Sequence, residues 1–340
     1  MNILITGGAG FIGSILVSKL FQAKSRYYSV DRFAELTDED FNPEYNPSHL
    51  LTFDKITVYD NLMYKQVCLT DFCYRKEFEF VQGDVRDWKK LKTYVEEADV
   101  IIPLAAIVGF PACEKDKDLA WAINHDHVAR IATFIKDTKK MIIYPNTNSG
   151  YGVGDKDFCT EESPLNPISV YGKSKVDAEK AVLSVNGIAL RLATVFGVSP
   201  RMRLDLLVND FTYKAINDGY IVLFEKDFRR NYIHIQDVAL TFIKMINEYN
   251  IHKGNAFNVG LSSANLSKWD LCQKIKEYIP KFSIQSDEIN KDPDKRDYIV
   301  SNEKLEKTGW QPYYSLDDGI QELIKAYTII QNNNRKYTNL

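Results

Sequence analysis

The feature that most constrains this chain is the glycine-rich segment TGGAGFIG at residues 6–13. It directly follows a short apolar run and precedes residues 12–22, where apolar positions recur with near-helical period. At a first strand-to-helix turn the glycines have separate tasks: Gly7 permits the tight turn, Gly10 lets a pyrophosphate approach the backbone, and Gly13 allows close helix–strand packing. The free N–H groups of the helix then face the phosphates. The segment therefore predicts a dinucleotide-binding turn, with contacts from Gly7, Gly10, Phe11, Ile12 and Gly13.

Short β-branched or aromatic runs alternate with longer helical patterns as far as residue 192, which is typical of repeated βαβ units and a parallel sheet. We therefore expect an α/β fold with a Rossmann-type doubly wound parallel sheet over residues 1–192. Helices are predicted at 12–22 and 116–136. The predicted strands are Asn2–Thr6, Lys55–Asp60, Glu77–Val81, Val100–Leu104, Met141–Asn146 and Ile188–Leu192.

Two segments depart from this rhythm. Residues 24–54 are rich in acidic residues, Asn and Pro without a sustained period, and are interpreted as an insertion at the rim of the sheet. From 193 to 330 the order of elements is less regular, so we expect a smaller α/β C-terminal domain that binds substrate in the cleft between the two lobes. Residues 331–340 are predicted to be a flexible tail.

The composition narrows the class of protein. A net charge of −3 gives no basic excess for nucleic acid, and no apolar run is long enough to cross a membrane. The start has no signal-peptide pattern, and the five cysteines form no CxxC pair, so we expect a cytoplasmic protein with reduced thiols. His125 and His127 flank Asp126, but no further ligands accompany them, so no metal is predicted.

An acidic residue at the end of the second strand is expected to hydrogen-bond the adenosine ribose and select NAD. Asp31 has the conventional spacing from the glycines, whereas Asp60 ends a better strand, KITVYD. We favour Asp60, together with the adjacent Asn61, and keep Asp31 as the alternative.

Further landmarks follow in a fixed order along nearly the whole chain. Together they resemble the extended short-chain dehydrogenase/reductase family, especially its nucleotide-sugar epimerases and dehydratases. The resemblance implies that NAD is the cofactor, that Asp84 and Val85 hold the adenine, and that Asn124 belongs to the site. Residues matching the family segment that lines the cofactor are Leu104, Ala105 and Ala106. The landmarks are GDVRD (83–87), PLAA (103–106), NTNSGYG (146–152), YGKSK (171–175), RLATVFG (191–197), RNYIHIQDVA (230–239) and KRDYIVSNEKLEKTGWQP (295–312).

Tyr171 and Lys175 are four residues apart on a predicted helix, so both side chains lie on one face. A tyrosine with an ordinary pKa near ~10 is a poor base at neutral pH, and a neighbouring ammonium is expected to favour the phenolate. The resemblance implies that Tyr171 takes the proton of a sugar hydroxyl, that Lys175 also holds the nicotinamide ribose, and that Thr147 hydrogen-bonds the reacting oxygen.

The two residues after Thr147 help to distinguish among the reactions that the family catalyses. In the 4,6-dehydratases of the family they are usually Asp and Glu, the acid and base of water elimination, whereas here they are Asn148 and Ser149. We therefore expect an NAD-dependent nucleotide-sugar epimerase that acts through a transient keto sugar, most often at carbon 4. A 4-dehydrogenase or a ketoreductase of the same family is the alternative, and a non-catalytic NAD-sensing or RNA-associated scaffold is an alternative of another class.

Arginines are expected to bind the nucleotide diphosphate, because their planar fork makes bidentate contacts with phosphate oxygens. The resemblance places Arg296 and Arg230 in this role. Thr194 replaces a family asparagine, so the contact is expected to be rebuilt locally. The segment 199–211, with Arg201, Arg203 and Asn209, is one source of that contact, and the alternative is that this segment is a basic loop leading into a core helix. The resemblance further implies a homodimer in which helices at 116–136 and 168–185 pair across a two-fold axis.

Overall fold

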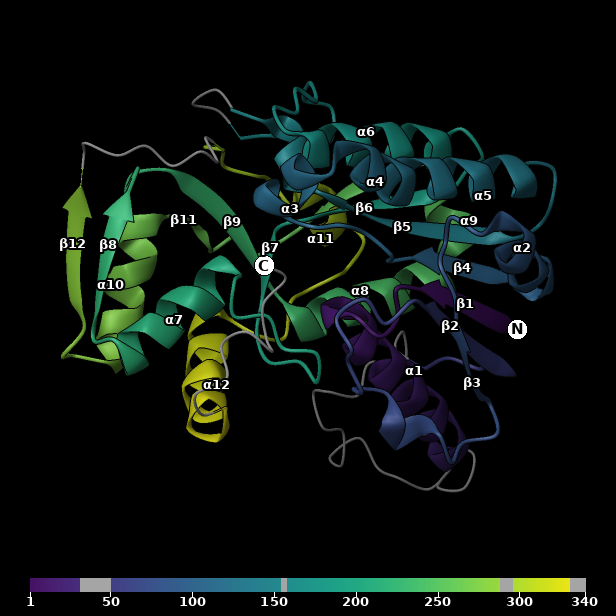
Figure 1. Cartoon of the computed structure of the whole chain (residues 1–340), viewed down its shortest axis with the longest axis horizontal. Coiled ribbons are helices and arrows are strands. Elements are labelled where there is room, and N and C mark those ends of the chain that lie inside the picture. Colours follow the sequence, from purple (N-terminus) through teal and green to yellow (C-terminus); the bar gives the residue numbers. More distant parts are fainter. Residues whose placement is uncertain (31–49, 154–157, 288–295, 331–340) are drawn as a thin grey trace.

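The computed structural model describes residues 1–30, 50–153, 158–287 and 296–330. Within them, a seven-stranded parallel sheet forms the larger lobe, with strand order β10-β6-β5-β4-β1-β2-β3 (Figure 1). Its strands are β1 (Asn2–Thr6), β2 (Lys55–Asp60), β3 (Phe78–Gln82), β4 (Val100–Pro103), β5 (Met141–Thr147), β6 (Ile188–Leu192) and β10 (Ala256–Val259). All six predicted strands are present, with ends that shift by at most one residue.

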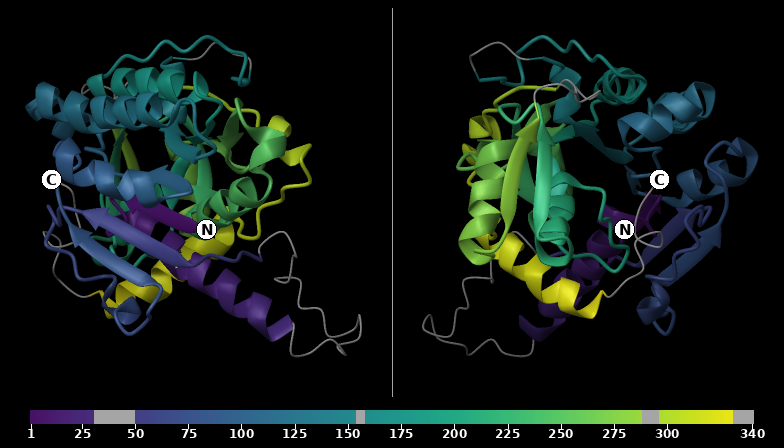
Figure 2. Two further views of the ribbon diagram at one scale, coloured as in Figure 1. Left: turned by 90° about the vertical axis from the view of Figure 1, so that its right-hand side faces the viewer. Right: turned by 60° about the vertical axis from the view of Figure 1, so that its left-hand side comes forward.

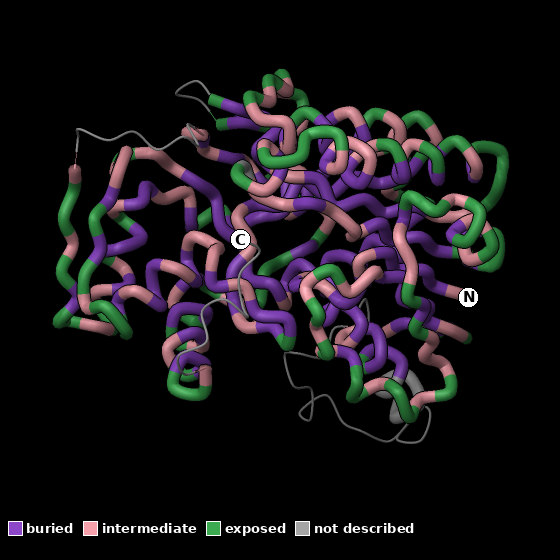
Figure 3. Tube along the Cα trace, viewed as in Figure 1, coloured by how far each residue is buried: buried purple, intermediate pink, exposed green. Residues whose placement is uncertain are grey.

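The strand order reverses between β1 and β4, which places a ligand crevice at their carboxyl ends. Because side chains alternate along a strand, Ile3 and Ile5 join one apolar cluster and Leu4 joins another on the opposite face. Both faces are therefore covered, and the central strands are buried along nearly their whole length (Figure 3). This is the Rossmann-type α/β arrangement predicted from the sequence.

Helices cover the two faces of the sheet (Figure 1). One face carries α1 (Phe11–Val30) and α8 (Ile235–Asn247). The other face carries α2 (Trp88–Glu97), α3 (Phe110–Lys115), α4 (Lys117–Trp121), η4 (Ala122–Asp126), α5 (His127–Ile135) and α6 (Val170–Leu183). Short elements elsewhere are η3 (Thr70–Phe72), η5 (Asn148–Tyr151), α9 (Tyr249–His252) and α11 (Glu303–Glu306).

Two helices differ from their predicted form. α1 continues beyond residue 22, because Ala23 and Lys24 are buried and the Lys24 ammonium forms an ion pair with Glu77 at 2.9 Å. The first residues of the predicted insertion at 24–54 are therefore helical, while Asp31 lies outside the described residues. The helix predicted at 116–136 consists of α4, the π-helical η4 and α5.

A smaller lobe packs beside the sheet (Figures 1 and 2). It contains a three-stranded sheet of β7 (Thr194–Phe196), β9 (Arg229–His234) and β11 (Asn265–Ser267), and a parallel pair of β8 (Tyr220–Phe224) and β12 (Ser283–Asp287). Three helices complete it, α7 (Leu207–Asn217), α10 (Lys268–Tyr278) and α12 (Leu316–Ile329). The domain division near residue 192 stays a proposal, since α8 and β10 follow that residue and lie with the large sheet.

No helix in the part of the chain described here is both long and apolar enough to span a lipid bilayer.

Candidate active site

A cavity of about 540 Å³ runs from the glycine-rich turn, past the end of β5, to the smaller lobe. It brings together most of the residues predicted to form the site. The predicted residues on its wall are Gly7, Gly10, Phe11, Ile12, Gly13, Asp60, Asn61, Val85, Leu104, Ala105, Ala106, Thr147, Tyr171, Lys175, Thr194, Arg203, Arg230 and Arg296.

The glycine-rich turn has the tight geometry that its sequence predicts. Gly7 has φ +70°, and a Cβ there would overlap the backbone of Ala105, so the turn lies directly against the segment after β4. A Cβ at Gly13 would overlap Gly8 of the turn itself, so this glycine lets the start of α1 approach the turn. A Cβ at Gly10 would meet only Gly7 O, at 3.1 Å, which leaves backbone facing the cavity. The turn therefore fits a pyrophosphate held by backbone N–H groups.

Asp60 closes β2 beside this turn. Its Oδ2 accepts a hydrogen bond from Ala9 N at 3.0 Å, and its Oδ1 accepts one from Leu62 N at 2.8 Å. Burial raises the pKa of the carboxyl group, and these two backbone donors lower it. Asp60 thus fixes the turn and faces the same cavity, a position that suits a ribose hydroxyl.

Two predicted residues are not on the cavity wall. Asp84 forms an ion pair with Arg86, at 2.7 Å between Oδ2 and Nη2, and its neighbour Val85 lines the cavity instead. Asn124 is buried in η4, where its Oδ1 accepts from Ile107 N at 2.8 Å and its Nδ2 donates to Ile107 O at 2.9 Å. In this structure Asn124, which lies in the π-helical η4, holds the segment after β4.

Thr147, Tyr171 and Lys175 all lie on the wall of the cavity. Thr147 ends β5, and the other two lie one turn apart on α6, whose N-cap is Ser169. The Thr147 hydroxyl donates to Ser149 Oγ at 2.9 Å, and the Thr147 side chain lowers the pKa of Tyr171 against the larger effect of burial. The predicted trio is therefore brought together from a strand end and one helical face.

The protonation of the pair differs from the sequence-based expectation. Burial raises the pKa of Tyr171 to about 12, and the charges of Arg296 and Arg203 oppose this rise. Burial also lowers the pKa of Lys175 to about 7, while the nearby Glu179 carboxylate raises it. The expectation that Lys175 lowers the pKa of Tyr171 is wrong for this structure, because desolvation outweighs charge at both groups.

Arg296 reaches the catalytic end of the cavity from the smaller lobe. Its Nη1 donates to Ser149 Oγ, the hydroxyl that is bonded to Thr147. The backbone bridges Val153↔Asp297 and Cys159↔Val300 hold this segment against the loop that follows η5. The position of Arg296 is thus set by β-bridges on both sides of residues 154–157.

Other cations line the substrate side of the same cavity. Arg203 pairs with Asp205 at 2.5 Å, and Arg230 is buried with its guanidinium over the Tyr298 ring at 5.6 Å. Sequence reasoning did not assign Lys268 or Tyr298 to the site, and both are on the wall. No motif pointed to Lys268, which follows β11 and comes near the cavity where β11 pairs with β9.

Within the described ranges there is no group of three or more His, Cys, Asp or Glu side chains that could hold a metal ion.

Comparisons with known proteins agree with this geometry. Residues 3–260 match the NAD dependent epimerase/dehydratase family. Over 96% of its length the chain is 25% identical to the low-salt glycan biosynthesis protein Agl12 of Haloferax volcanii, covering 98% of that protein. It is 24% identical to a putative UDP-glucose 4-epimerase of Methanocaldococcus jannaschii, over 98% of this chain and 99% of that one.

Solved structures share the fold. A dTDP-glucose 4,6-dehydratase from Streptomyces venezuelae, crystallised with NAD and TYD bound, superposes with a TM-score of 0.78 at 22% identity, covering 97% of both chains. An identity this low carries the fold and not the reaction. The family match and the side chains of the cavity must therefore carry the functional argument.

Proposed function

The chain belongs to the NAD dependent epimerase/dehydratase family, and from this premise we propose that it is an epimerase of a nucleoside-diphosphate sugar that acts through a transient 4-keto sugar. The observation that carries the proposal is the continuity of one cavity. It joins a dinucleotide-binding turn, the trio Thr147, Tyr171 and Lys175, and a wall rich in arginine.

The residues of the turn hold the cofactor. Gly7, Gly10 and Gly13 present backbone to the pyrophosphate, and Asp60 receives the adenosine ribose. When bound, NAD supplies the acceptor and later the donor of a hydride. Lys175 holds the nicotinamide ribose, and the position of Lys175 on the cavity wall supports this role.

Tyr171 is the general base. Because burial raises the pKa of Tyr171, the phenol must first lose its own proton, and the phenolate then takes the proton of the sugar hydroxyl while Thr147 donates a hydrogen bond to the same oxygen. Thr147 and Tyr171 line the same cavity, which supports a shared target oxygen. Arg203, Arg230 and Arg296 bind the diphosphate and so hold the sugar beside Tyr171.

The positions of the acidic residues in the cavity favour epimerisation over dehydration. Among the described residues on the cavity wall, only Asp60 and Asp205 carry carboxylates. Asp60 lies at the glycine turn and Asp205 is paired with Arg203, so neither provides a free acid or base beside Thr147. Ser149 is bonded to Arg296, and Asn148 is buried off the cavity. This favours reversible oxidation over removal of water.

The test is to incubate the purified chain with UDP-, GDP-, CDP- and dTDP-sugars. The sugars are followed by NMR and the reduced nicotinamide by absorbance. We expect a stereoisomer of one sugar to form without release of reduced cofactor. Accumulation of a keto sugar with stoichiometric NADH would instead identify a dehydrogenase. A chain that binds NAD but converts no sugar, and is retained by a protein or RNA partner, would contradict the enzymatic proposal.

We also propose that two copies associate through α4, α5 and α6, the elements at the positions predicted for the dimer. Light scattering at working concentration is expected to give twice the mass of the chain, and a single-chain mass would contradict this.

A further inference from the structure

Glu179 lies on the catalytic face of α6. It follows Lys175 by one turn and Tyr171 by two, so the three side chains share a helical face. Only 2% of Glu179 is exposed, which is rare for a carboxylate unless it is paired. Its sequence position, eight residues after Tyr171, was the signal available for it, yet sequence reasoning passed it over.

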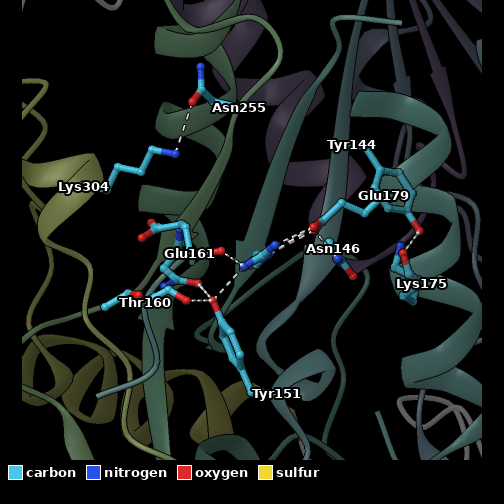
Figure 4. Close-up of polar contacts among 11 residues, drawn as sticks. Tyr144, Asn146, Tyr151, Thr160, Glu161, Lys175, Glu179, Asn255 and Lys304 are labelled. Atoms are coloured by element: carbon cyan, nitrogen blue, oxygen red, sulfur yellow. Dashed lines mark hydrogen bonds and ion pairs between the residues drawn. The ribbon is translucent and has the colours of Figure 1, made fainter. Parts of the chain in front are cut away.

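Arg191 of β6 is the partner of Glu179. Its Nη2 lies 2.6 Å from Glu179 Oε1, and its Nε lies 3.1 Å from Oε2. Arg191 is itself only 5% exposed, and its Nη1 donates to the Tyr151 hydroxyl at 3.0 Å. The fork-like contact fixes both carboxylate oxygens of Glu179 (Figure 4).

A second contact links Glu179 to the strand that carries Thr147. Asn146 Nδ2 donates to Glu179 Oε2. Asn146 immediately precedes Thr147 in β5, lines the cavity, and has a buried Oδ1 with no hydrogen-bond partner among the described residues. The carboxylate therefore bridges α6 and the end of β5, as Figure 4 shows for Asn146 and Glu179.

The network continues outward to the smaller lobe side of the cavity. The Tyr151 hydroxyl donates to Asn258 Oδ1 of β10 at 2.7 Å, and Asn258 Nδ2 donates to Ser301 O at 3.0 Å. Each of these side chains is buried. Glu179 is thus held in one place by groups from several elements.

The groups around Lys175 determine how strongly the Glu179 carboxylate affects the charge of Lys175. Glu179 is the acidic group that acts on Lys175 from its own helix. From the other elements packed against it, Lys175 faces Cys113 of α3, the ring of Tyr144 of β5 at 4.1 Å, and His127 of α5. His127 is buried, and its pKa is lowered to about 4, so near neutral pH it carries no charge. Burial likewise raises the pKa of Cys113 to about 11, which leaves that thiol neutral.

We propose that Glu179 is a positioning residue of the active site: one turn from Lys175 on the same buried face of α6, it provides the negative charge that acts on the ammonium, and through Asn146 it holds the end of β5 that carries Thr147. This deepens the proposed function and rests on it for the roles of Lys175 and Thr147. Glu179 does not line the cavity and so acts only through these neighbours.

A purely structural ion pair would stabilise the fold without affecting Lys175, so the decisive measurement is the titration of Lys175 itself. The chain is labelled with 13C at lysine Cε, and the Lys175 resonance is assigned by its loss in Lys175→Met. In Glu179→Gln the midpoint of this titration is expected to fall by about 1 pH unit, because a nearby opposite charge is removed. An unchanged midpoint in the folded variant would overturn the proposal.

Two control variants separate charge from fold. Asp177→Asn removes a half-buried carboxylate, paired with Lys180, from the same helix, and Tyr151→Phe removes one hydrogen bond from Arg191 while Glu179 stays. Both are expected to keep the midpoint of the wild type, although Tyr151→Phe lowers the melting temperature. A shift in Asp177→Asn as large as in Glu179→Gln would count against the specific role of Glu179.

A double variant tests the proposal even if Glu179→Gln alone fails to fold. Glu179→Gln leaves Arg191 as an unpaired buried charge, whereas Glu179→Gln with Arg191→Gln leaves none. The double variant is expected to lower the midpoint by a smaller amount, because the Arg191 cation that opposes the Glu179 charge is removed with it, and an unchanged midpoint there also overturns the proposal. Since the titration needs no sugar, it decides the role of Glu179 even if no nucleotide sugar is converted, while turnover by the wild type tests the proposed function separately.

Discussion

The ammonium nitrogen of Lys175 lies 4.1 Å from the centre of the Tyr144 ring, a cation–π contact inside the large lobe. Burial in this environment lowers the pKa of Lys175 to about 7. An aromatic face offsets part of the desolvation of a cation, but it does not replace the water that an exposed ammonium has. Lys175 therefore lies at a functional position, but burial of its ammonium destabilises the folded state.

Because the buried Lys175 ammonium destabilises the folded state, replacing it by an apolar residue is expected to stabilise the protein. The unfolded chain keeps the Lys175 proton up to a pH near 10.5, whereas the folded chain loses it near 7, so between these values the unfolded state binds more protons and stability rises with pH. Lys175→Met is expected to melt about 2 °C or more above the wild type below pH 7, with a difference that shrinks as the pH approaches 10.5. Thermal unfolding across this range checks it. Lys180→Met, an exposed lysine of the same helix, should show no such trend.

Tyr171→Phe is expected to lower turnover by about 10²–10⁴-fold, because it removes the group that transfers the proton. NAD affinity should stay close to that of the wild type, since the phenyl ring keeps the wall of the cavity. The measurement is turnover with the converted sugar, beside NAD binding by calorimetry. Tyr74→Phe, at a tyrosine that is 76% exposed, provides the matched control. Equal turnover in the two variants would remove Tyr171 from its role.

The parts of the structure that could be predicted are those determined by residues close together in the sequence. The apolar runs of β1 and β2 and the glycines between β1 and α1 each determine their own backbone, so both strands end at the residues expected. The preference for Asp60 over Asp31 also rests on strand propensity, a local property, and the role of Asp60 toward the ribose stays a prediction.

What could not be predicted depends on long-range burial. The sequence spacing of Tyr171 and Lys175 places them on one face, but it says nothing of the surrounding low-dielectric core that moves both pKa values. The same holds for Glu179 and Arg191, which meet only because β6 lies beside β5 beneath α6. Asp84 forms an ion pair with Arg86, a local contact that the family pattern does not include, and its role toward the adenine stays a prediction.

The choice between Asp60 and Asp31 leads to a binding prediction. Asp60→Asn should weaken NAD binding by about 10-fold or more, because a charged hydrogen-bond acceptor contributes roughly 1.5–3 kcal/mol and this one also anchors Ala9 of the turn. Asp31→Asn should bind NAD as the wild type does. Calorimetric titration of both variants with NAD measures the two affinities. If Asp31→Asn bound NAD more weakly than Asp60→Asn, Asp31 rather than Asp60 would contact the ribose.

Arg296 gives the prediction that is most specific to this site. Arg296→Lys should raise KM for the nucleotide sugar by about 10-fold or more, because a lysine ammonium cannot reproduce bidentate phosphate contacts. NAD affinity should be unchanged, since Asp60 and the glycine turn lie at the other end of the cavity. Steady-state kinetics with calorimetry of NAD binding separate the two effects. Arg130→Lys, an exposed arginine on α5, is the control. If Arg296→Lys lowered kcat instead and left KM unchanged, its bond to Ser149 would make Arg296 a positioning residue for Thr147 and exclude a role in holding the diphosphate.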